Sequence, residues 1–112
     1  MQYALMIYTE AGHDTELSED ERIAEKAEYE TLRDDRRFLG GTRLQPAETA
    51  TSVRVAGGRT LLTDGPFADT KEVLGGICLV EAANLDEALE LAASIPAARH
   101  GVVEVRPLAE QR

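Results

Sequence analysis

The chain has no tryptophan, one cysteine and few basic residues, and each shortage excludes a class of function. Aromatic residues make up only 4% of the 112 residues, too few for a surface that stacks nucleic-acid bases. Twelve Lys and Arg against 21 Asp and Glu give a net charge of −9. Phosphate contacts need clustered positive charge, so direct binding to nucleic acid or to an anionic membrane is not expected. The single Cys78 lies in an apolar run, which predicts a buried and unreactive thiol.

Several familiar motifs are also missing. No apolar run approaches the roughly 20 residues of a membrane-spanning helix, and the N-terminus lacks the basic region of a signal peptide. We therefore expect a cytoplasmic protein. Glycine pairs occur, but none belongs to a phosphate-binding loop. His13 and His100 lack metal-ligand spacing and a cysteine partner, which predicts two surface histidines and no metal or other cofactor.

What the sequence does contain is a regular order of strand and helix patterns in a single domain spanning residues 1–112. Ser18 and Glu21 form a capping-box pattern at the start of a helix that we expect to run to about residue 37. Asn84, with Glu87 three residues later, begins a second helix that Pro96 ends. Strands are expected at 3–8, 42–45, 51–55, 59–63, 77–81 and 102–107. This order predicts the α+β class, a ferredoxin-like βαββαβ fold with an inserted β-hairpin.

The first expected strand is apolar on both of its alternating faces, residues 3–8 reading YALMIY. In a ferredoxin-like fold both helices cover the same face of the sheet, so the other face needs a different cover. A second copy of the chain is the simplest one. The pattern therefore predicts a twofold homodimer.

The most informative segment is TDGPFADTKE, residues 63–72, which leaves a strand and turns at a Gly-Pro pair. Two interpretations of Asp64 remain open. It shares a strand face with Leu62, where desolvation would raise its pKa towards that of a general base. An Asp before Gly-Pro is also a standard turn former, whose carboxylate bonds the local backbone.

Five further side chains are candidates for holding a small ligand, each with a structural alternative. Three are polar residues of the same segment that suit a carboxylate or enolate oxygen, or else satisfy the loop: Thr63, Thr70 and Lys71. Arg43 offers a positive charge to an anionic ligand, or else a salt bridge. Tyr8 offers a phenolic hydrogen bond, or else core packing.

The DGPF motif at residues 64–67 is similar to the signature of YCII-related proteins of the DGPF-domain branch. The likeness extends along most of the chain, through residues 38–46, 49–55, 74–77, 85–89 and 103–107. The resemblance implies a dimeric α+β barrel with a pocket between the helix-free sheet faces and the signature loop. It also implies a catalytic His–Asp pair whose Asp falls on Asp64. The partner histidine is expected in the first helix, yet residues 18–37 contain none.

Two functional hypotheses follow from the residues and the resemblance together, and a third possibility is a purely structural dimer whose pocket is filled by its own side chains. The first is a protein that binds a small organic ligand, as a sensor or as an accessory of the sigma factors that the DGPF branch often accompanies. The alternative is a cofactor-independent lyase or isomerase, in which Asp64 abstracts a proton from a carbon next to a carbonyl group.

Overall fold

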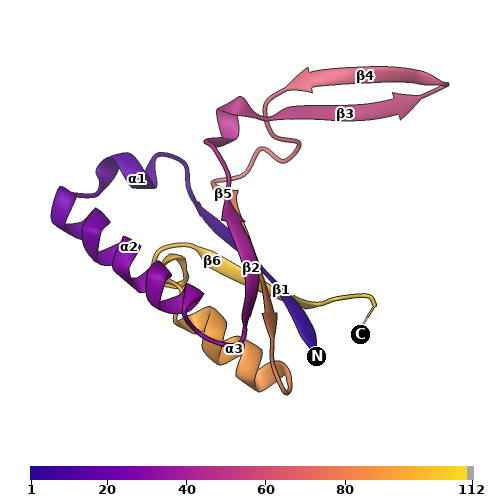
Figure 1. The fold of residues 1–112 in the computed structure, drawn as a ribbon. Helices are drawn as coiled ribbons and strands as arrows, with labels where there is room; N and C mark the ends of the chain where they lie inside the picture. Colours follow the sequence, from indigo (N-terminus) through magenta and orange to yellow (C-terminus); the bar gives the residue numbers. More distant parts are fainter. Residues whose placement is uncertain (111–112) are drawn as a thin grey trace.

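The computed structural model describes residues 1–110, apart from the side chains of Asp14 and Thr15. The elements in order are β1 (Gln2–Glu10), α1 (His13–Glu16), α2 (Glu19–Arg33), β2 (Phe38–Arg43), η1 (Ala47–Thr49), β3 (Thr51–Ala56), β4 (Arg59–Asp64), β5 (Glu72–Glu81), α3 (Leu85–Ala93), η2 (Pro96–Arg99) and β6 (Val102–Pro107). Four strands form an antiparallel sheet in the order β2-β5-β1-β6, and β3 pairs with β4 separately. Helices α2 and α3 lie on one side of the sheet (Figure 1). The predicted α+β ferredoxin-like fold with its inserted hairpin is confirmed.

Both helices begin where their capping residues predict. The Ser18 hydroxyl accepts a hydrogen bond from the Glu21 backbone at 3.1 Å, and the Glu21 carboxylate accepts one from the Ser18 backbone at 3.0 Å. The Asn84 side chain accepts from the Glu87 backbone at 3.0 Å. These bonds satisfy N–H groups that a helix start leaves without partners. None of the described helices is both long and apolar enough to cross a membrane.

Two of the three glycine pairs, Gly40-Gly41 and Gly75-Gly76, lie inside strands, which corrects two predicted boundaries. Strand β2 begins at Phe38 and β5 at Glu72, so both include glycines that the sequence pattern placed outside them. A side chain at Gly41 would stand 2.9 Å from the Ile77 carbonyl oxygen, and one at Gly76 would stand 3.1 Å from the Thr42 carbonyl. These glycines permit close approach of neighbouring strands rather than a turn.

The core lies between the sheet and its helices. On β1 the buried side chains are those of Tyr3, Leu5 and Ile7, which alternate with half-buried ones. Cys78 belongs to the same core, and burial raises the pKa of its thiol, as the apolar run predicts. The opposite side of the sheet, which we call the helix-free face, has no such cover. Leu79 at its centre is 38% exposed.

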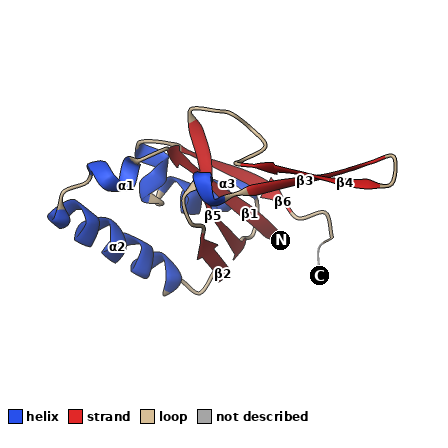
Figure 2. Ribbon diagram, turned by 90° about the horizontal axis from the view of Figure 1, so that it is seen from above, coloured by secondary structure: helices blue, strands red, loops and turns tan. Residues whose placement is uncertain are grey.

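The β3–β4 hairpin projects from the body as an arm on the side away from the helices (Figures 1 and 2). Its turn, Gly57-Gly58, has positive φ angles of 56° and 74°, as the sequence predicts for a two-residue hairpin. Apolar side chains on the arm are largely exposed, and they are Val53, Val55, Leu61 and Leu62. An isolated two-stranded hairpin is at best marginally stable in water. The arm therefore needs a surface to pack on.

Candidate functional site

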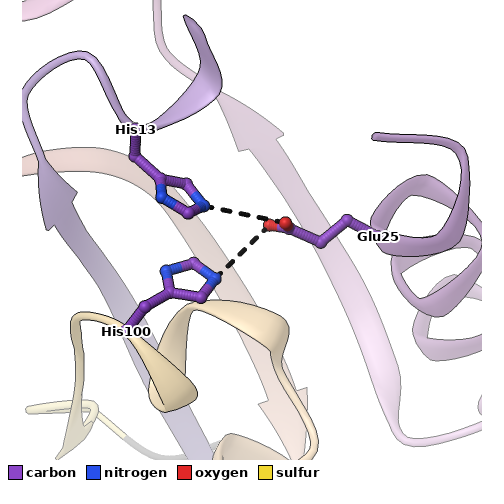
Figure 3. A group of neighbouring side chains, drawn as sticks. All are labelled: His13, Glu25 and His100. Carbon is purple, nitrogen blue, oxygen red and sulfur yellow. Dashed lines mark ion pairs between the residues drawn. The ribbon is translucent and has the colours of Figure 1, made fainter. Parts of the chain in front are cut away.

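Two histidines and a glutamate meet at one end of the sheet, on its helix-covered side (Figure 3). The His13 and His100 rings are stacked, with centroids 3.8 Å apart and planes 25° apart. Glu25 faces both rings. One of its oxygens lies 3.7 Å from Nε2 of His13, and the other lies 3.7 Å from Nε2 of His100. We call these three side chains the histidine cluster.

The topology of the sheet brings the two histidines together from opposite ends of the chain. Strands β1 and β6 pair antiparallel, with Tyr8 opposite Val102. The end of β1 therefore lies beside the start of β6. His13 follows β1 as the first residue of α1, and His100 follows η2 just before β6. Glu25 is supplied from the middle of α2, which packs over this end of the sheet.

Local contacts fix the backbone on either side of His100. A Cβ atom at Gly101 would overlap the Tyr8 carbonyl oxygen, so only glycine fits there. On the other side, the Arg99 guanidinium donates two hydrogen bonds of 2.9 Å to the Glu28 carboxylate. Glu28 lies one turn after Glu25 on α2. The bidentate pair therefore holds η2 against the helix that carries the third member of the cluster.

The half-buried phenol of Tyr29 lies on α2, the helix that also carries Glu25. Burial raises the pKa of Tyr29 to about 12, and the negative charge of Glu25 adds to the effect. The positive charge of Arg43 acts on Tyr29 in the opposite direction. Both charged residues thus lie within electrostatic reach of Tyr29. This end of the molecule combines imidazole, carboxylate and phenol groups.

The spacing within the cluster is too wide for direct hydrogen bonds between Glu25 and the two imidazole rings. A hydrogen bond between a ring N–H and a carboxylate spans about 2.7–2.9 Å, so 3.7 Å is too long for one. Among the described residues, buried Nε2 of His13 has no hydrogen-bond partner. Two imidazole nitrogens and a carboxylate around one point are able to hold a proton or a divalent cation.

The candidates from the signature segment lie elsewhere. Thr63 and Asp64 end β4 on the hairpin arm, and both are exposed. In the loop that follows, the Thr70 hydroxyl donates to the Glu72 carbonyl at 2.5 Å. The Lys71 ammonium lies 3.0 Å from the Glu10 carboxylate, which raises the pKa of Lys71. These polar groups are thus arranged along an exposed connection.

Tyr8 and Arg43 point to opposite sides of the sheet. Strand alternation places Tyr8, which follows buried Ile7, on the helix-free face. Arg43 aligns with Gly41, whose Cβ position is 3.1 Å from the Cys78 sulfur on the helix-covered side. The two candidates therefore cannot hold the same ligand within one chain.

A shallow groove of about 370 Å³ runs between α2 and α3. Its lining is rich in charge and consists of Glu28, Thr31, Leu32, Asp35, Arg37, Glu90, Leu91 and Ser94. The Arg37 guanidinium donates to the Asp35 carboxylate at 2.8 Å and to Glu87 at 3.2 Å. Its hydrogen-bonding capacity is largely used within the protein, and the groove contains none of the predicted site residues.

The family model of the YCII-related domain matches residues 1–112. The chain belongs to the YCII-related family. An uncharacterised protein of Rhizobium meliloti (strain 1021) is 48% identical to this YCII-related chain over 69 residues. That match covers 60% of the chain and 56% of the relative's length.

A solved structure is similar over nearly the whole fold. It is the 5-chloro-2-hydroxyhydroquinone dehydrochlorinase of Burkholderia phenoliruptrix AC1100, in complex with 2,5-dihydroxybenzoquinone. The TM-score is 0.54 and the sequence identity 15%, over 99% of this chain and 96% of the other. At this identity the likeness shows the fold alone.

The sequence predicted none of the histidine cluster. Along the chain, Glu25 is one of several charged residues on its helix, a pattern typical of a solvated face, and the two histidines have no metal-ligand spacing. The feature of the sequence that could have located the cluster is the order of its strands in the predicted fold. In the predicted fold the first and last strands are adjacent and antiparallel, so residues after the first and before the last meet at one edge.

Proposed function

We propose that this YCII-related protein acts as a homodimer that binds a small organic ligand between two helix-free sheet faces. The observation that carries the proposal is the amount of surface that one chain leaves exposed. A compact monomer of 12.2 kDa exposes about 6,100 Å², by the usual scaling of area with mass. This chain exposes 8023 Å².

The excess of roughly 1,900 Å² per chain is in the range of an obligate dimer interface. Its source is the combination of an uncovered sheet face and a projecting arm, which gives extents of 45 × 41 × 19 Å. The arm and the helix-free face border the same side of the molecule (Figure 2). A second copy bound there would contact both the helix-free face and the arm.

The side chains on the helix-free face suggest the ligand's character. Alternation places Ala4, Met6 and Tyr8 of β1 there, with Ile77 and Leu79 of β5 beside them. Over β1 and β5 this surface is apolar with one phenolic hydroxyl, and β6 adds the ion-paired Glu104 and Arg106 opposite Met6 and Ala4. It suits a ring or short chain with few oxygen atoms. The quinone bound by the structurally similar dehydrochlorinase belongs to that class. Phenols, quinones and lactones are therefore the first compounds to test.

A thermal-shift panel of these compounds tests the proposal, with EDTA present throughout so that metal ions play no part. A ligand at 100 times its Kd stabilises the folded chain by about 2.7 kcal/mol, which raises the Tm of a small domain by several degrees. Tyr8→Phe should reduce the shift, whereas Tyr29→Phe, on the helix-covered side, should not. A protein that remains monomeric and responds to no compound contradicts the proposal.

A catalytic role is the second candidate, with Asp64 as the general base of a lyase or isomerase. The position of Asp64 in the chain favours it, since Asp64 ends β4 of the arm and the arm projects on the side away from the helices (Figure 2). Asp64→Asn should abolish turnover of a compound that binds, without changing the Tm. Undiminished turnover rejects that role.

The same binding activity would serve a sensor that accompanies a sigma factor. Co-purification of such a factor, changed by the ligand, is the expected sign. If a sigma factor from the same cell does not co-purify, with or without the ligand, the protein does not use its ligand site in this way.

A further inference from the structure

The histidine cluster lies apart from the proposed ligand surface, on the opposite side of the sheet. We propose that His13, Glu25 and His100 form a binding site for a first-row divalent transition-metal ion, with Zn²⁺ as the simplest representative. The inference is independent of the dimer and its organic ligand. It rests on spacing, on an unsatisfied atom and on the charge around the cluster.

The spacing suits an ion held between the side chains. One ligand atom from each residue lies within 4.8 Å of the others. Atoms that each bind a zinc ion at about 2.1 Å with a tetrahedral angle are separated by about 3.4 Å. The two distances from Glu25 to the imidazole nitrogens are both 3.7 Å. The distances from the carboxylate to the imidazole nitrogens are thus within a few tenths of an ångström of that separation, whereas direct hydrogen bonds would need a larger contraction.

The unsatisfied atom is Nε2 of His13. This nitrogen is buried and lacks a hydrogen-bond partner among the described residues. A buried polar atom without a partner costs free energy unless a bound atom or ion contacts it. A bound cation accepts this lone pair.

The charges around the cluster favour a cation. The chain has a net charge of −9, and Glu21 acts electrostatically on His13. The nearby Arg99 does not oppose a metal ion, because its guanidinium is engaged by Glu28. A divalent ion beside one carboxylate and two neutral imidazoles leaves a single net positive charge. An acidic protein accommodates that charge readily.

The donor set determines the kind of ion. Two imidazole nitrogens with one carboxylate suit zinc, iron, cobalt or nickel better than magnesium or calcium, which prefer oxygen donors. Three protein ligands leave at least one coordination position for water or an oxygen of a small molecule. Coordination uses lone pairs in the ring planes, so binding opens the 25° angle between the rings. His100, with 29% of its side chain exposed, has room to tilt.

Calorimetric titration with Zn²⁺ tests the site in the whole protein. We expect saturable uptake of one ion per chain, weakened at least roughly 100-fold in His13→Ala, Glu25→Gln and His100→Ala. Glu30→Gln is the matched control, because it removes an exposed carboxylate from the same helix. Equal uptake by wild type and all three cluster variants overturns the site, as does the absence of saturable binding.

A second measurement does not depend on whether the variants fold. Long-range proton–nitrogen NMR of the wild-type imidazoles follows both rings during the titration. Binding of Zn²⁺ should shift the Nε2 resonances of His13 and His100 together, with a one-to-one end point. Resonances that stay unchanged while zinc binds elsewhere overturn the proposal. Because the ligand panel contains EDTA, failure of the metal site and failure of the ligand proposal are separate results.

Discussion

A charge placed at the centre of the helix-free face should convert the dimer into monomers. Leu79 occupies that position on β5, between neighbouring strands β1 and β2, and is 38% exposed in one chain. Leu79→Glu introduces an unpaired carboxylate that the dimer would bury without a partner. Leaving such a charge unpaired costs about 3 kcal/mol. A twofold interface contains the change twice, so the total is about 6 kcal/mol.

A loss of about 6 kcal/mol raises the dimer Kd by roughly 10⁴-fold, enough to give monomers at micromolar concentration. Leu89→Glu is the matched control, since Leu89 on α3 is 46% exposed on the helix-bearing side. Sedimentation equilibrium should give twice the chain mass for wild type and control, and a concentration-dependent lower mass for Leu79→Glu. A monomeric wild type, or an undisturbed dimer of Leu79→Glu, refutes the reasoning.

Three further predictions concern the helix-covered side. Tyr29 has a pKa of about 12 when folded and about 10 when unfolded, so the folded state retains a proton that the unfolded state has lost between these values. The free energy of unfolding should therefore fall as pH rises from 10 to 12, by about 2–3 kcal/mol, and Tyr29→Phe should remove this component in urea titrations. Gly101→Ala should destabilise the fold by about 3 kcal/mol, because its Cβ overlaps the Tyr8 carbonyl; an unchanged Tm would contradict the packing. Ser18→Ala should cost about 1 kcal/mol in urea unfolding, since it removes the α2 cap, and a neutral result would mean that the cap contributes nothing.

Local chemistry made much of the fold predictable. Capping bonds at Ser18 and Asn84 depend on residues three positions away, and the Gly57-Gly58 turn depends on two adjacent backbones. Such features are determined within a few residues, so the sequence pattern located them well. Gly41 is different, because it admits a carbonyl group from β5, a long-range contact that the local sequence does not reveal. Helix α2 ends at Arg33, before the predicted end at about residue 37, and strand β2 begins at Phe38, before the predicted start at residue 42.

The candidate site depended on long-range contacts throughout. Glu25 resembles its solvent-facing neighbours on α2, and only the position of the two rings distinguishes it. The sequence predicts Arg43 and Tyr8 as ligand-binding candidates by their charge and phenol, which does not say which face of the sheet each occupies. The strand register determines which face of the sheet each side chain occupies. That register follows from strand pairing, which one sequence does not reveal directly. The predicted fold is confirmed, and its adjacent first and last strands place His13 and His100 at the same end of the sheet.

The most direct test of the histidine cluster is an anomalous-difference map from a crystal of the protein grown with zinc. We predict a zinc peak within coordination distance of His13, Glu25 and His100, with the imidazole rings opened from their stack. A map in which the zinc lies elsewhere, and the three side chains keep their present spacing, would contradict the metal site.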